Sequence, residues 1–142
     1  MNFQLSENEK ISGKKAFEVL AAKGRSFFSF PCRIIWMETD NPLKHRAQVA
    51  FVAPKKIFKS AVKRNRIKRL LRETYRLHKN EFYQELEKRG KYLRILFVYT
   101  HRELPEFHEL EGKIIVTLNR LIKATDDGFR NHNKEKPSGK ND

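Results

Sequence analysis

The stretch that decides the fold is SAVKRNRIKRLLRETYRLHKN, residues 60–80. Ser60 suits the N-cap of a helix, which we expect to run to about Leu86 before Gly90 breaks the chain. At about 100° per residue, one face of this helix forms a predicted buried stripe of Ile67, Leu70, Leu71, Thr74 and His78. The opposite face presents Asn65, Lys68, Arg69, Arg72, Arg76 and Lys79. The pattern therefore predicts a helix that buries one side and offers hydrogen-bond donors on the other.

The positive charge of the chain is concentrated around this helix. The whole chain has 31 Lys and Arg against 17 Asp and Glu, a formal net charge of +14. Residues 55–79 contain eleven basic residues and one acidic residue, Glu73, so they hold +10 of that charge. Arg69–Glu73 is the only i,i+4 pair of opposite charge on the basic side, whereas Arg72 has like-charged neighbours at that spacing. This distribution indicates a polyanion as partner and favours nucleic acid over an acidic membrane or protein.

Before the basic helix, the sequence predicts one helix and three strands. The helix is expected over Ser12–Ala22, with Ser12 as N-cap and Gly24 as the stop. The strands are expected, in chain order, over Ser26–Phe30, Cys32–Glu38 and Arg46–Ala53.

After the basic helix, Tyr92–Thr100 is almost continuously apolar and predicts a central strand. A last helix is expected from Pro105 to about Ala124. The order αβββαβα predicts an α+β fold, one sheet with the helices packed on one face. We assign residues 1–124 to a single domain and residues 125–142 to a polar tail that we expect to be disordered.

Several classes of protein are disfavoured. The single cysteine, Cys32, cannot form an internal disulfide or a thiolate zinc cluster. The longest apolar run, around Leu93–Tyr99, is far shorter than the roughly 18–20 residues that cross a bilayer. The first residues do not resemble a signal peptide, so we expect a cytoplasmic protein. The five histidines are scattered and no catalytic constellation or metal-ligand spacing is evident, which argues against a stand-alone nuclease.

Residues 61–73, AVKRNRIKRLLRE, resemble the signature of the bacterial ribonuclease P protein family, known as the RNR motif. Lys55-Lys56 after a strand, and the Phe17 helix followed by KGRS at 23–26, are similar to the same family pattern. The resemblance spans about residues 5–124 in element order and is specific residue by residue over about 55–76. Two features depart from it: the segment 57–60 is one residue longer, and Ala21 stands where the family commonly has a second aromatic.

The resemblance implies a fold and a function. The fold would be an α-β sandwich, similar to that of some ribosomal proteins, with the basic helix in a left-handed βαβ crossover. The chain would be the protein subunit of ribonuclease P, binding the catalytic RNA and the 5′ leader of precursor tRNA and assisting removal of that leader. The RNA would hold the Mg²⁺ ions and cleave the phosphodiester, and the sequence shows no metal or catalytic site in the protein.

The same resemblance implies roles for individual residues. Docking on the catalytic RNA is expected for Arg64, Asn65, Arg66, Lys68, Arg69 and Arg72. From their place beside these residues, we add Lys55, Lys56, Lys63 and Arg76. The leader would lie in a cleft between the sheet and the first helix, where the candidates are Phe17, Phe28, Phe30, Trp36 and the outward-facing residues of the strand Gln48–Ala53, with Phe51 named among them. Packing in the core is the alternative for each of these aromatic residues.

Two other hypotheses remain beside this one. A structural RNA-binding protein, such as a ribosomal protein, would also present a basic helix, and the motif at 64–73 is what distinguishes the two. A DNA-binding helix module would need a compact helical domain, which the predicted strands oppose. The sequence leaves open the oligomeric state, the leader preference and the role of the tail.

Overall fold

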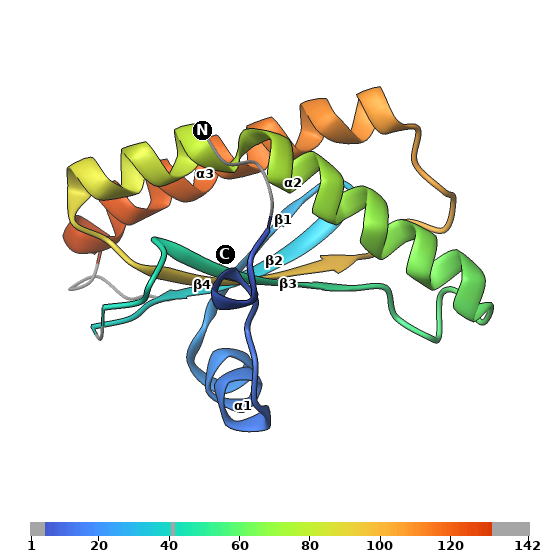
Figure 1. Cartoon of the computed structure of the whole chain (residues 1–142), viewed down its shortest axis with the longest axis horizontal. Coiled ribbons are helices and arrows are strands. Elements are labelled where there is room, and N and C mark those ends of the chain that lie inside the picture. The colour runs from blue at the N-terminus through green and yellow to red at the C-terminus, as the bar shows by residue number, and fades with distance from the viewer. Residues whose placement is uncertain (1–4, 41, 132–142) are drawn as a thin grey trace.

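The computed structural model describes residues 5–40 and 42–131. In this part of the chain a short 3₁₀ turn, η1 (Glu7–Glu9), precedes three α-helices and four strands (Figure 1). They are, in chain order, α1 (Lys14–Lys23), β1 (Arg25–Ser29), β2 (Cys32–Glu38), β3 (Ala47–Val52), α2 (Ala61–Arg89), β4 (Leu93–Tyr99) and α3 (Phe107–Asn131). The expected element order is confirmed, and the bounds of β2 agree at both ends.

The strands form one mixed sheet in the order β1-β2-β4-β3. β1 pairs antiparallel with β2, and β2 with β4, whereas β3 and β4 are parallel. β4 therefore lies inside the sheet, as its apolar sequence predicts. Its buried side chains alternate with half-buried ones, since Leu93, Ile95, Phe97 and Tyr99 face the core.

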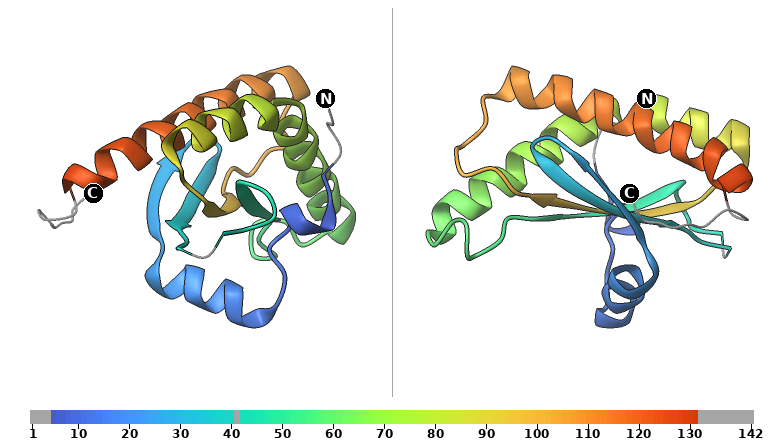
Figure 2. Two further views of the ribbon diagram at one scale, coloured as in Figure 1. Left: turned by 60° about the vertical axis from the view of Figure 1, so that its left-hand side comes forward. Right: turned by 180° about the vertical axis from the view of Figure 1, so that it is seen from behind.

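The connection from β3 through α2 to β4 decides the architecture. Seen from the side of α2 with both strands pointing upward, the chain moves to the left from β3 to β4 (Figure 1, Figure 2). This crossover is left-handed, a rare exception to the right-handed rule for parallel strands. It places α2 on one face of the sheet, beside α3, and the first turns of α2 extend beyond the end of β4 (Figure 1).

The helices lie on both faces of the sheet, so the prediction that they share one face is wrong for α1. α2 and α3 cover one face, and α1 lies on the other (Figure 2). Successive strand side chains point to opposite faces, and Ile35 on the second face needs cover. Leu20 of α1 is fully buried, and Gly24 approaches Ile35 so closely that a Cβ would lie 2.8 Å from Ile35 Cγ2.

The main core lies between the sheet and the pair α2 and α3. It contains a cluster of aromatic rings, in which Tyr75 of α2 contacts Phe97 of β4 with ring centroids 5.9 Å apart. A buried hydrogen bond of 2.7 Å joins the hydroxyls of Ser29 and Thr117 and ties β1 to α3. The core thus fixes the rotation of α2 about its own axis.

The helix ends agree with the sequence in part. Ser60 caps α2, since its Oγ accepts a hydrogen bond of 3.3 Å from the Lys63 N–H. Gly90 follows in the left-handed conformation at φ 64°. α1 begins at Lys14, with Gly13 in place of Ser12 as N-cap.

The last helix is longer than expected. α3 starts at Phe107, after Pro105, and continues past Ala124 to Asn131. Thr125 is buried, and Asp126 pairs with Arg89 of α2 at 2.7 Å. The start of the predicted tail is therefore helical, and residues 132–142 of that tail lie outside the described residues.

Candidate nucleic-acid interface

One side of α2 is buried much as predicted. Ile67, Leu71 and Thr74 are inaccessible to solvent, and Leu70 and His78 are half-buried. The Thr74 hydroxyl donates to the Leu71 carbonyl at 2.9 Å, which satisfies this polar group inside the core. The buried side also includes Tyr75, a residue that the sequence analysis left out of the stripe.

The other side of α2 presents the predicted basic residues to solvent. We call the following set the basic face: Lys63, Arg64, Asn65, Arg66, Lys68, Arg69, Arg72 and Arg76. Lys63, Asn65, Arg66 and Arg69 are exposed, and the other four are half-buried. All of these residues belong to one 29-residue helix, so the backbone fixes the positions of their Cα atoms relative to one another.

A single acidic side chain neutralises part of the basic face. Glu73 Oε1 accepts from Arg76 Nη2 at 2.6 Å, instead of from Arg69 as its i,i+4 spacing suggested. The hydrogen bond from Arg76 holds the pKa of Glu73 below its ordinary value. In the described part of the chain this is the one ion pair on the basic face. Arg69 keeps its charge available to a partner.

Arg64 of the basic face also stabilises the loop that precedes α2. Its Nη1 donates to the carbonyls of Phe58 and Lys59, at 2.9 and 3.0 Å. The guanidinium thereby holds the loop before α2 against the first turn of the helix. Because a guanidinium has five N–H donors, it keeps others for a phosphate.

The loop at 54–60 places two predicted RNA-binding lysines beside the N-terminus of α2. Ile57 and Phe58 both donate their backbone N–H to the Pro54 carbonyl at 3.1 Å, which makes a tight turn. The Phe58 side chain is buried, with its ring centroid 6.1 Å from that of Tyr99. The extra length in segment 57–60 is therefore anchored in the core. Lys55 and Lys56 are left exposed near a helix end that favours anions.

Lys79 does not belong to the basic face, contrary to the prediction. It is 3% exposed, and its Nζ lies 2.8 Å from both carboxylate oxygens of Glu9. Tyr83 and the Ser6 N–H also donate to Glu9, each at 2.8 Å. Burial raises the pKa of Glu9, but these hydrogen bonds and the Lys79 charge outweigh burial and lower it overall. This buried ion pair fastens the N-terminal segment to α2.

Two aromatic residues predicted for the leader cleft lie on the wrong side of the sheet. Trp36 is 3% exposed in the main core, because it alternates with Ile35 along β2 and faces α2 and α3. Phe51 faces the same side, with its ring stacked on Phe97 at 5.2 Å. Neither side chain reaches the surface beside α1.

The remaining aromatic candidates do not form one cluster. Phe17 is 36% exposed on α1 and shares a helix side with the buried Leu20, three residues on. Phe30 lies at the turn between β1 and β2, where its ring centroid is 5.0 Å from His101 and 6.4 Å from Phe28. Lys113 of α3 lies 5.8 Å from the Phe30 ring. The structure therefore places Phe30 against the loop after β4 and the start of α3.

Two arginines on the α1 side of the sheet, Arg33 and Arg94, were missed by the sequence analysis, whereas Gln48 belongs to the strand whose outward-facing residues it predicted for the cleft. Arg94 of β4 donates from Nε to Oε1 of Gln48 on β3 at 3.0 Å, and both are half-buried. Arg33 of β2 is exposed on the same side. The signal was present, since charged residues that alternate with apolar ones in a strand must point away from the core.

Other kinds of site find no support in the described part of the chain. No group of three or more His, Cys, Asp or Glu side chains there could hold a metal ion. No helix among the described residues is long and apolar enough to cross a membrane. Burial raises the pKa of the Cys32 thiol to about 12, so this cysteine is a neutral core residue at neutral pH.

Comparison with known proteins places this basic helix in a family. A family model described as Ribonuclease P matches residues 5–122. The chain belongs to the ribonuclease P protein family. A ribonuclease P protein component from Porphyromonas gingivalis strain W83 is 33% identical over 120 residues, 84% of this chain and 87% of that protein. The component from Chlorobium phaeobacteroides is 29% identical, covering 78% and 82% of the two chains.

Solved structures support the fold of this family. The ribonuclease P protein of Staphylococcus aureus superposes with a TM-score of 0.63 at 17% identity, over 80% of this chain and 94% of that one. The protein from Thermotoga maritima gives 0.63 at 19% identity, over 79% and 96%. The family resemblance and the sandwich fold that it implied are confirmed.

Proposed function

We propose that this chain is the protein subunit of ribonuclease P, which binds the catalytic RNA and precursor tRNA and assists removal of the 5′ leader. The observation that supports it best is the basic face of α2. Its cations lie on one rigid helix, and all of them except Arg76 lie within the RNR motif. Among the described residues, Glu73 is the acidic side chain that forms an ion pair on this face. Such a row suits the phosphates of a folded RNA, since arginine can bind a phosphate in bidentate fashion.

In this proposal, the RNA performs the chemistry and holds the Mg²⁺ ions. The chain supplies fixed positive charge, which replaces part of the cation atmosphere that two folded RNAs need in order to approach each other. This predicts that the protein lowers the magnesium concentration required for cleavage. Lys55, Lys56 and Lys63 extend the charge around the N-terminus of α2.

The leader would pass along the α1 side of the sheet. Phe17 on α1 offers an exposed ring for stacking, and Arg33, Gln48 and Arg94 offer donors from three strands. Unpaired RNA is bound by this combination of aromatic and basic groups. Trp36 and Phe51 have no part in this contact, because they face the opposite side of the sheet.

Cleavage of a precursor tRNA at low magnesium tests the proposal. Three mixtures are compared: bacterial ribonuclease P RNA alone, this protein alone, and both together. We expect efficient cleavage with the two together and little with either alone. Activity of the protein alone would reveal a catalytic site in the chain. Binding of the RNA without stimulated cleavage would favour a structural RNA-binding protein instead.

A further inference from the structure

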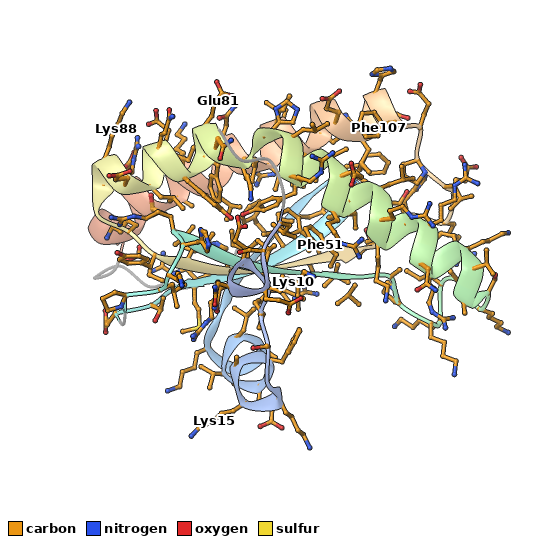
Figure 3. The ribbon with its side chains drawn as sticks, in the orientation of Figure 1. Lys10, Lys15, Phe51, Glu81, Lys88 and Phe107 are labelled. Atoms are coloured by element: carbon orange, nitrogen blue, oxygen red, sulfur yellow. The ribbon has the colours of Figure 1, made fainter. Side chains whose placement is uncertain are left out.

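A hollow of about 250 Å³ lies between the N-terminal segment, β3 and the basic face of α2. Figure 3 labels Lys10 and Phe51, which contribute to it from the N-terminal segment and from β3. Its lining residues are Leu5, Lys10, Ile11, Val49, Ala50, Phe51, Lys68 and Arg72. Sites for small molecules usually measure roughly 300–1,000 Å³, so this hollow has room for one small planar group.

One lining residue is an aromatic ring held firmly from behind. Phe51 stacks on Phe97 at 5.2 Å with an angle of 29° between the rings, and it meets Tyr75 edge-on at 5.9 Å. Both supporting rings belong to the core and are inaccessible to solvent. Because the Phe51 ring is already ordered, a second ring could stack on it without a large loss of conformational entropy.

The charged groups of the hollow are all positive. Lys68 and Arg72 enter from α2 and Lys10 from the N-terminal segment, and the lining includes no Asp or Glu. In the described part of the chain, Lys68 and Arg72 form no ion pair, while Lys10 pairs with the exposed Glu7 at 3.4 Å. An aromatic surface with cations around it matches the face of a nucleobase and its neighbouring phosphates.

The wall opposite α2 is built into the fold. The Ile11 N–H donates to the Val49 carbonyl at 3.0 Å, so the N-terminal segment pairs with the outer edge of β3. The buried pair of Glu9 and Lys79 fixes the same segment to α2. Glu9 is thereby neutralised below the surface, and its charge does not oppose a phosphate at the hollow.

We propose that this hollow binds one unpaired base of the RNA that docks on α2. The base would stack on Phe51, and Lys68, Arg72 and Lys10 would contact the phosphates on either side of it. The inference rests on the proposed function and adds to it a site that holds a base, where the rest of the basic face holds phosphates. It also gives Phe51 a role on the α2 side of the sheet.

The first test separates stacking from charge. Affinity for bacterial ribonuclease P RNA is measured over a series of salt concentrations for the unchanged chain, for Phe51→Leu and for Arg72→Gln. Loss of a stacked base should weaken binding by roughly 10-fold or more, with an unchanged salt slope. Arg72→Gln should reduce the slope by about 0.7, the value for one phosphate contact with a single strand. Thermal unfolding of each variant shows whether it is folded at the assay temperature.

The second test reports contact directly and does not depend on a loss of packing. Tryptophan emission is followed during titration with the same RNA for Phe51→Trp, and for Phe107→Trp at the start of α3 as a matched control (Figure 3). The native Trp36 is buried and gives a constant background. We expect RNA to quench the emission of Phe51→Trp and to leave that of Phe107→Trp nearly unchanged.

The outcomes distinguish this inference from the proposed function. Equal affinity of Phe51→Leu and the unchanged chain, with no quenching of Phe51→Trp, would overturn the base site while low-magnesium cleavage still supported the subunit. A chain that neither bound the RNA nor stimulated cleavage would overturn both.

Discussion

Glu9 and Lys79 are 70 residues apart in the sequence, and both carboxylate oxygens of Glu9 lie 2.8 Å from Lys79 Nζ. The pair is almost completely buried, with side-chain exposures of 1% and 4%. It joins the N-terminal segment to the middle of the helix that bears the RNR motif. Lys79, which the helical period placed on the exposed basic side, is thus part of the scaffold that supports that side.

Removal of one partner of this pair should destabilise the protein strongly. Glu9→Ala leaves the Lys79 ammonium buried without its counter-ion, which typically costs about 3–5 kcal/mol in the free energy of unfolding. Urea denaturation followed by circular dichroism measures the change. Glu7→Ala is the matched control, since it removes an exposed carboxylate of the same turn and should have almost no effect. Equal stability of the two variants would contradict the account of the buried pair.

The same pair predicts a direction for the pH dependence of stability. The folded-state pKa of Glu9 is lower than its ordinary value of 4.5, so the unfolded chain takes up a proton first as the pH falls. The contribution of Glu9 is fully present above about pH 4.5 and is lost as the pH falls through the folded-state pKa. The stability difference between the unchanged chain and Glu9→Gln should therefore shrink in acid. A stability difference that grew on acidification would contradict the lowered folded-state pKa of Glu9.

Substitution of alanine for two glycines, Gly24 and Gly112, should change the stability of the protein in opposite directions. At Gly24, a Cβ would lie 2.5 Å from the Leu20 carbonyl oxygen and 2.8 Å from Ile35 Cγ2, so Gly24→Ala must push α1 away from β2. We expect a loss of about 1–3 kcal/mol. Gly112 lies inside α3 with nothing within 4 Å of an added Cβ, so Gly112→Ala should gain roughly 0.5–1 kcal/mol. Thermal unfolding of both variants checks this, and stabilisation by Gly24→Ala would refute the close approach.

Substitution of Arg69 should lower RNA affinity alone, whereas substitution of Arg64 should lower both RNA affinity and thermal stability. Arg69→Ala removes an exposed charge, so RNA affinity and its salt slope should fall, the slope by about 0.9, while thermal stability stays the same. Arg64→Ala also removes two hydrogen bonds to the loop before α2, and it should lower stability as well as affinity. Filter binding over a salt series, together with thermal unfolding, separates the two effects. Unchanged affinity and slope in Arg69→Ala would contradict RNA docking by this face.

Most of the fold was predictable from local patterns. β2 alternates buried and more exposed residues, and its predicted bounds agree with the structure. α2 has a capping serine and a glycine stop at positions that fix both ends. The side of the sheet covered by α1 was not predictable, because it depends on the close contact of Gly24 with Ile35, which joins two elements.

The candidate site was predicted less evenly, for a physical reason. Exposure of a helix face follows from its period, so most of the basic face of α2 lies where the sequence placed it. Lys79 is the exception, since a distant carboxylate buries it. The aromatics Trp36 and Phe51 were misplaced because residue type alone does not say which face of a strand a ring occupies. The strand pattern did contain that information in the alternation of Arg33 and Arg94 with core residues.

The most direct test of the central claim is the low-magnesium cleavage rate of the reconstituted enzyme, with the exposed part of the basic face neutralised. The triple variant Lys63→Gln, Arg66→Gln and Arg69→Gln changes three exposed side chains and should fold normally. We predict that it loses most of the stimulation at low magnesium and recovers activity as magnesium is raised. Stimulation equal to that of the unchanged protein at low magnesium would contradict the claim that α2 docks on the RNA.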